Sequence, residues 1–145
     1  MSLLQIRAFK PEDEEAVVDL WRRCNLLRPW NDPHDDIACK LEVQPELFLV
    51  AALAGRVVAS AMAGYEGHRG WINYLAVDPD CRRQGLGRRI MAEAERLLRA
   101  RGCPKINLLV RSDNVEAMSF YERIGFERDA VVSYGKRLKS TAPGS

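Results

Sequence analysis

The 145-residue sequence lacks several features that would assign it to a specialised class of protein. Its four cysteines form no C-x-x-C pair, and together with the two histidines they show no spacing typical of a zinc site. The longest apolar run, 47–54, is too short to cross a bilayer, and no signal-peptide pattern opens the chain. These absences predict a cytoplasmic protein with reduced cysteines, no metal site and no membrane partner.

An excess of charge of one sign is also missing. Lysines and arginines number 22 against 20 aspartates and glutamates, so the formal net charge of +2 gives no reason to expect nucleic acid as a partner. Hydrophobic residues make up 47% of the chain without biased tracts, which excludes a disordered or fibrous protein. We expect a single domain over 1–145 whose tail, 139–145, frays.

The sequence does contain an alternation of strand-like and helix-like hydrophobic patterns. Strands are expected at 4–8, 47–53, 57–65, 71–77, 105–110 and 126–138, the last as one strand or a pair. Helices are expected from Pro11 to a point before Pro29, from 31–33 to about 43, at 85–101 and at 114–123. This order predicts a mixed α/β domain with one sheet.

The most informative segment is R-R-Q-G-L-G at 82–87, between an expected strand and an expected long helix. Backbone N–H groups at a helix N-terminus point outward and favour an anion, and glycines let a ligand approach them. Positive charge is concentrated here by the arginines at 82, 83, 88 and 89. A diphosphate would fit, although a glycine-containing turn flanked by solvated arginines explains these residues equally well. A P-loop pattern is absent, and Ile90 stands where a dinucleotide fingerprint needs its third glycine.

The pattern R-x-x-G-x-G after a strand ending in V-D-P resembles the pyrophosphate loop of the GNAT (GCN5-related N-acetyltransferase) family. Downstream, N-V-E-A at 114–117 and F-Y-E-R-I-G-F at 120–126 are similar to that family's second signature. The two signatures are independent and correctly ordered, and the resemblance extends over nearly the whole chain. More narrowly, 24–33 and 64–70 resemble a bacterial subgroup of the family that is named for the YpeA protein.

The resemblance implies a single mixed, mainly antiparallel sheet of six to seven strands, flanked by four helices, with splayed central strands. It also implies acetyl-CoA as co-substrate. The pyrophosphate would bind backbone amides of 83–88, and the pantetheine arm would bond to the preceding strand and to the side chain of Asn114. The implied binding residues are Leu75, Ala76, Val77, Arg82, Arg83, Gln84, Gly85, Leu86, Gly87, Arg88 and Asn114. Asn114 can alternatively serve as a helix N-cap, and the two roles are compatible.

Tyr121 resembles the family's general acid. A phenol with a pKa near 10 stays protonated at neutral pH and could protonate a departing thiolate; an ordinary core tyrosine is the alternative. The implied activity is acetyl-CoA-dependent N-acetylation of a primary amine by direct attack in a ternary complex. A non-catalytic acetyl-CoA sensor and an unrelated nucleotide-binding regulator are the competing hypotheses.

The general base is where the sequence departs from better understood relatives. Ribosomal-protein alanine acetyltransferases resemble the stretch 108–114 but carry a catalytic glutamate where Leu109 stands. Histone acetyltransferases place a glutamate early in the strand before the loop, where the nearest match is Trp71. A water chain to solvent is therefore the preferred hypothesis, with Glu66, His68 and Tyr74 as candidate side chains.

The acceptor site is expected between 28–32, which joins the first two helices, and 65–69 opposite. Its candidate residues are Arg28, Trp30, Asp32, Glu66, His68 and Tyr74. Trp30 is equally a candidate packing anchor for the helix connection. The mixed charge could suit a zwitterionic metabolite or a peptide end, and neither the acceptor nor a homodimer, which is common in the family, is determined by the sequence.

Overall fold

The computed structural model describes residues 3–139 and divides the chain into two compact units, 1–108 and 109–145. Each unit is described by itself. The tail expected to fray, 139–145, lies outside the described residues except for Lys139. The expectation of one domain over the whole chain stays a prediction.

The first unit is built on a five-stranded sheet with the strand order β1-β2-β3-β4-β5. The first four strands are antiparallel to their neighbours, and β5 is parallel to β4. The strands are β1 (Leu4–Ala8), β2 (Phe48–Leu53), β3 (Arg56–Tyr65), β4 (Gly70–Val77) and β5 (Ile106–Leu108). The mixed, mainly antiparallel sheet expected from the sequence is confirmed.

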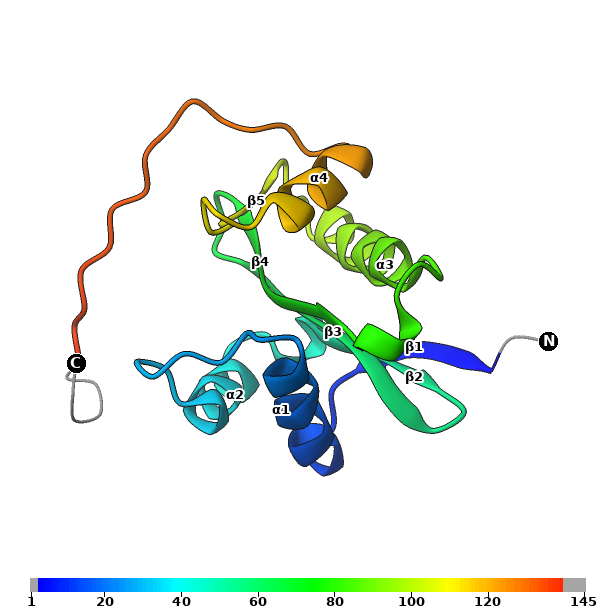
Figure 1. Ribbon diagram of the computed structural model, residues 1–145. Helices are drawn as coiled ribbons and strands as arrows, with labels where there is room; N and C mark the ends of the chain where they lie inside the picture. Colours follow the sequence, from blue (N-terminus) through cyan, green and yellow to red (C-terminus); the bar gives the residue numbers. More distant parts are fainter. Residues whose placement is uncertain (1–2, 140–145) are drawn as a thin grey trace. The chain divides into compact units, whose positions relative to one another are not determined.

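Helices cover both faces of this sheet (Figure 1). On one face lie α1 (Glu14–Arg23) and α2 (Pro33–Glu42), and on the other lies α3 (Leu86–Ala100). The second unit contains α4 (Val115–Arg123). Three short 3₁₀ turns complete the described elements: η1 (Pro11–Asp13), η2 (Pro45–Leu47) and η3 (Pro79–Cys81).

Two apolar layers explain why these helices dock. The α1 stripe buries Leu20 and Trp21 against Phe48 of β2, and Phe48 stacks on Phe9 with ring centroids 4.5 Å apart. On the opposite face, α3 buries Ile90 and other residues at helical spacing. The hydrophobic periodicity of both helices was therefore a correct guide to their buried faces.

The hairpin between β2 and β3 follows from its turn residues. Ala54 and Gly55 both have positive φ values, 51° and 83°, and Leu53 pairs directly with Arg56. A two-residue loop with this backbone matches the twist of the flanking strands. The turn expected at Ala54-Gly55 is confirmed.

The central strands separate along their length. β5 pairs with β4 only over Gly70–Ile72, and no described strand of the first unit pairs with β4 beyond Ile72 on that side. Residues 73–77 of β4 therefore present backbone hydrogen-bonding groups at an open edge. The expected splay of the central strands is present.

The end of the chain departs from the expected fold. The expected strand at 105–110 is shortened to Ile106–Leu108, and the strand or strands expected at 126–138 are not formed in the described part of the second unit. Apolar side chains of that segment, which alternation placed in a sheet, are 77–94% exposed at Val131, Val132, Tyr134 and Leu138. A strand requires a paired edge as well as an alternating pattern. The described sheet thus has five strands, not six to seven.

Candidate active site

The segment that follows β4 is anchored by the carboxylate of Asp78, which is only 2% exposed. Its Oδ1 accepts a hydrogen bond from the backbone N–H of Asp80 at 2.9 Å and lies 3.0 Å from Nη1 of Arg23. Nη2 of Arg56 lies 3.4 Å from Oδ2. The Arg23 hydrogen bond is the main cause of a lowered pKa at Asp78. Because a buried carboxylate needs such partners, these contacts fix the end of β4 to α1 and β3.

The arginine loop, defined as residues 82–88, connects this anchor to α3. Arg83 and Gly85 have φ values of 66° and 76°, so the chain passes twice through the left-handed region. Residues 82–85 are exposed, whereas Leu86 and Gly87 are buried at the start of α3. Among the described residues, we find no acceptor for the backbone N–H groups of 83–88. The loop therefore presents a row of donors to solvent.

The charge at this helix end is unusual within the chain. The first turns of the other α-helices carry acids, which the helix dipole favours: Glu14 and Glu15 in α1, Asp35 and Asp36 in α2, Glu116 in α4. The first turn of α3 carries no acid and contains Arg88 and Arg89. The dipole, the free N–H groups and the arginines all favour a bound anion here.

A bulge interrupts β4 next to its open edge. Ser60 pairs with Ala76 and Met62 pairs with Asn73, so two β4 residues, Tyr74 and Leu75, face one residue of β3. Tyr74 has a φ of 54°, a strained value for a residue with a side chain. Sequence reasoning missed this bulge, because no glycine marks it.

Packing from α1 holds Tyr74 in this conformation. Its ring stacks on the buried Trp21 with centroids 3.7 Å apart and an interplanar angle of 7°. Nε1 of Trp21 donates to Oγ of Ser60 at 2.9 Å, and Ser60 in turn donates to the carbonyl oxygen of Tyr74 at 2.8 Å. The strained residue is thus fixed through both its ring and its backbone.

The phenol of Tyr74 donates a hydrogen bond of 2.6 Å to Oδ2 of Asp36 on α2. Burial, followed by this contact with Asp36, raises the pKa of Tyr74 well above its usual value. A phenol in this state is a donor at neutral pH. The contact therefore argues against the candidate role of Tyr74 as a general base.

Three of the remaining acceptor candidates make local contacts that stabilise turns. Nη1 of Arg28 donates to the carbonyl oxygens of Asn25 and Leu27, and Oδ1 of Asp32 caps α2 by accepting from the N–H of His34 at 2.9 Å. Glu66 accepts the backbone N–H of His68 at 2.6 Å and also that of Arg69; these bonds lower the pKa of Glu66.

Two candidates are free for contact with a ligand. Trp30 is 41% exposed, so part of its ring is accessible to a ligand, and its alternative role as a packing anchor for the helix connection stays open. The side chain of His68 is exposed in the turn between β3 and β4.

The second unit contains the other two candidate residues of the donor site. Oδ1 of Asn114 accepts the N–H of Ala117 at 3.1 Å, which makes Asn114 the N-cap of α4. Tyr121 packs edge-on against Phe120 and Phe126, with centroids 5.2 and 5.6 Å away. Burial raises the pKa of Tyr121 to about 12, so its phenol is protonated at neutral pH.

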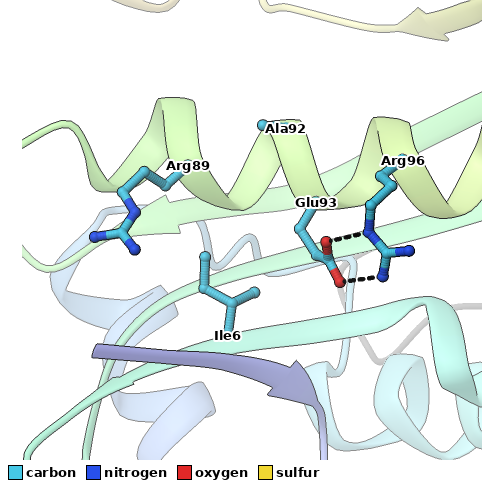
Figure 2. Close-up of a pocket in the computed structure, with 5 residues that line it drawn as sticks. All are labelled: Ile6, Arg89, Ala92, Glu93 and Arg96. Atoms are coloured by element: carbon cyan, nitrogen blue, oxygen red, sulfur yellow. Dashed lines mark hydrogen bonds and ion pairs between the residues drawn. The ribbon is translucent and has the colours of Figure 1, made fainter. Parts of the chain in front are cut away.

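A cavity of about 440 Å³ lies along α3 beside β1, and its lining on α3 begins at Arg89, directly after the arginine loop. Figure 2 shows its lining residues, with Ile6 of β1 facing the helix and Glu93 paired to Arg96. Arg89 reaches it from the first turn of α3 (Figure 2). No residue predicted for the acetyl-CoA or acceptor site lines this cavity.

Within residues 3–139, no group of three His, Cys, Asp or Glu side chains is placed to hold a metal ion. No helix in the same range is long and apolar enough to cross a membrane.

Residues 14–126, well over half of the sequence, match the model of the acetyltransferase (GNAT) family. The chain belongs to this family. An acetyltransferase of Sodalis glossinidius (strain morsitans) is 53% identical over 136 residues, which cover 93% of this chain and 96% of the relative. The GNAT resemblance seen in the sequence is confirmed.

Solved structures agree with this assignment. Ard1 from Thermoplasma volcanium superposes with a TM-score of 0.75 at 29% identity, covering 88% of this chain and 85% of that one. The ribosomal-protein-S18-alanine N-acetyltransferase from Escherichia coli superposes with a TM-score of 0.73 at 27% identity, covering 87% and 79%. This GNAT protein is an acetyltransferase, and acetyl-CoA is its co-substrate.

Proposed function

We propose that this acetyltransferase transfers the acetyl group of acetyl-CoA to a primary amine by direct attack in a ternary complex. The acetyl-CoA part of this proposal is supported by the arginine loop, which has unpaired N–H groups and no acid in the first turn of α3. The amine is supported by the relative from Escherichia coli, which is named as an N-acetyltransferase.

The donor would bind along the end of β4 and the arginine loop. Backbone N–H groups of 83–88 would hold the pyrophosphate, with Arg82, Arg83 and Arg88 adding positive charge. The amide-rich pantetheine arm would pair with the open edge at Leu75–Val77, where a backbone N–H could polarise the thioester carbonyl. The cap bond of Asn114 uses its Oδ1, so its amide nitrogen stays available to donate to the arm.

The reaction requires protons to leave the acceptor nitrogen and one proton to reach the departing sulfur. The amine nitrogen attacks the thioester carbonyl carbon, the carbon–sulfur bond breaks, and the departing thiolate takes the phenol proton of Tyr121. Water then reprotonates the phenolate. The acceptor ammonium loses one proton to a water chain before the attack and a second one as the amide forms, since Trp71 and Leu109 replace the carboxylates that relatives use. No cysteine nucleophile and no acyl-enzyme take part.

An acceptor screen tests this proposal. The chain is mixed with acetyl-CoA and one amine at a time, from L-amino acids, dipeptides, spermidine and kanamycin, and free thiol is measured. We expect thiol release above the amine-free rate with at least one compound, together with an acetylated product by mass spectrometry. Thiol release that no amine accelerates would overturn N-acetylation.

A further inference from the structure

Asp36 differs from the other shielded acids of the first unit in having no cationic partner. Each other acid that is buried or partly buried in residues 3–108 forms an ion pair, whereas Asp36, also partly buried, forms none with a described residue. The paired acids are Asp13, Glu14, Asp19, Asp78, Glu93 and Glu95. A shielded carboxylate that has no cationic partner in the protein can pair with a cationic group of a ligand.

Tyr74 holds this carboxylate in a defined position. Its phenol donates one hydrogen bond of 2.6 Å to Oδ2, and its ring is immobilised by stacking on Trp21. A carboxylate has about four acceptor sites, so one phenol leaves most of its capacity unused. The side chain of Asn31, from the loop between α1 and α2, also forms a hydrogen bond with this phenol. The carboxylate of Asp36 is therefore held in a defined orientation and can still accept further hydrogen bonds.

A second charge and an aromatic side chain lie on the same side of the sheet. Lys40 follows Asp36 by one helical turn on α2, and a Cβ placed on Gly64 would lie 3.4 Å from its Nζ. Gly64 pairs directly with Trp71, so Trp71, 36% exposed, extends toward the α2 side of the sheet. Lys40 is partly buried, forms no ion pair with a described residue, and has a pKa lowered by burial.

These groups adjoin the open edge of β4. Tyr74 immediately precedes Leu75, where the proposed pantetheine arm begins to pair with the strand. A ligand held by Asp36 would therefore lie near the part of β4 where the proposed arm pairs. Spacing of about one helical turn between Asp36 and Lys40 suits a compact molecule that carries both signs of charge.

We propose that Asp36 binds the ammonium group of the acceptor, with Lys40 facing a carboxylate or carbonyl of the same molecule, so that the acceptor is amino-acid-like. This proposal rests on the proposed N-acetyltransferase function. Asp36 binds and orients the amine, and Tyr74 acts as a positioning residue for Asp36. The protein carboxylate that binds the amine thus comes from α2. In the relatives, the catalytic glutamate instead lies in family motifs that α2 does not contain.

The decisive comparison is Asp36→Asn against Asp35→Asn. Both substitutions remove one acid from the first turn of α2, so they change the helix dipole interaction equally. With glycylglycine and L-lysine as acceptors, we expect Asp36→Asn to raise the acceptor KM about tenfold or more, a loss typical for a charged hydrogen bond. The KM for acetyl-CoA should stay unchanged, and Asp35→Asn should behave like the original chain.

Two further variants separate recognition from folding. Tyr74→Phe keeps the stacked ring but removes the donor to Asp36, and should raise the acceptor KM with little change in kcat. Lys40→Met should raise the KM for glycylglycine but not the KM for benzylamine, because benzylamine has no carboxylate. The proposal is overturned if the original chain acetylates glycylglycine or L-lysine and both Asp36→Asn and Tyr74→Phe leave the acceptor KM unchanged. A chain that acetylates no amine instead defeats the proposed function, and this proposal with it.

Discussion

Nη1 of Arg23 lies 3.0 Å from Oδ1 of Asp78, and this ion pair joins the last turn of α1 to the residue that follows β4. Asp78 is buried, and its second arginine, Arg56, comes from β3. Three elements of the first unit therefore converge on one carboxylate. The position of the arginine loop depends on this convergence, because the loop begins four residues further along the chain.

Replacing Asp78 with asparagine should disturb the loop more than the fold. The substitution removes the carboxylate that Arg56 and Nη1 of Arg23 face, while Arg23 keeps its ion pair with Asp19, and we expect a loss of about 1–3 kcal/mol in the free energy of unfolding. The KM for acetyl-CoA should rise about fivefold or more, whereas the acceptor KM should change little. Urea unfolding and steady-state kinetics provide the two measurements. Asp80→Asn is the control, because Asp80 is exposed and forms no ion pair with a described residue; equal effects of the two variants would refute the anchoring role.

Gly85→Ala tests whether the ligand approaches the arginine loop closely. Gly85 has a φ of 76° and open space around an added Cβ, so the substitution costs backbone strain of about 1–2 kcal/mol without a clash. Gly102→Ala is a matched control, with a φ of 82° and equally open space at the other end of α3. Both variants should lose similar stability. Only Gly85→Ala should weaken acetyl-CoA binding by calorimetry, and a loss of affinity in both would count against the loop as the pyrophosphate site.

Tyr121→Phe tests the general acid. If Tyr121 protonates the departing thiolate, its loss should lower kcat about 100-fold, with little change in either KM. Because burial raises the pKa of Tyr121 to about 12, the phenol stays protonated up to pH 10, and its titration should produce no fall in kcat between pH 6 and pH 10. Tyr134→Phe, at a side chain that is 94% exposed, is the control. Full turnover of Tyr121→Phe at every pH would remove Tyr121 from the mechanism.

The acid stability of the first unit should depend on Asp13. Its carboxylate pairs with Arg7 at 2.7 Å, and the Arg7 hydrogen bond lowers the pKa of Asp13 in the folded state. A lowered folded pKa gives stability that is present above the unfolded value of about 3.9 and is lost as pH falls through the folded pKa. Asp13→Asn should therefore destabilise the protein at pH 7 and much less at pH 2. Urea midpoints measured at both pH values decide this, and an equal loss at both would contradict it.

Local sequence signals predicted most of the first unit. The strand at 4–8 and the Ala54-Gly55 turn are confirmed, and the helix expected at 85–101 differs from α3 by one residue at each end. These features depend on neighbouring residues, whose periodicity and turn propensities can be read directly. The strand prediction for 126–138 was wrong because strand formation there depends on a distant part of the chain. The alternation of this segment resembles a strand, but pairing depends on an edge elsewhere in the molecule.

The sequence by itself determined the family and the arginine loop, because both are carried by contiguous residues whose backbone and charge can be read in order. Only the tertiary structure decided what surrounds the predicted acceptor residues. Tyr74 was a candidate base in isolation, but the bulge in β4 and the stacking on Trp21 turn its phenol toward Asp36, 38 residues away in the chain. Sheet register and helix docking create that contact, and neither leaves a local signal at Asp36.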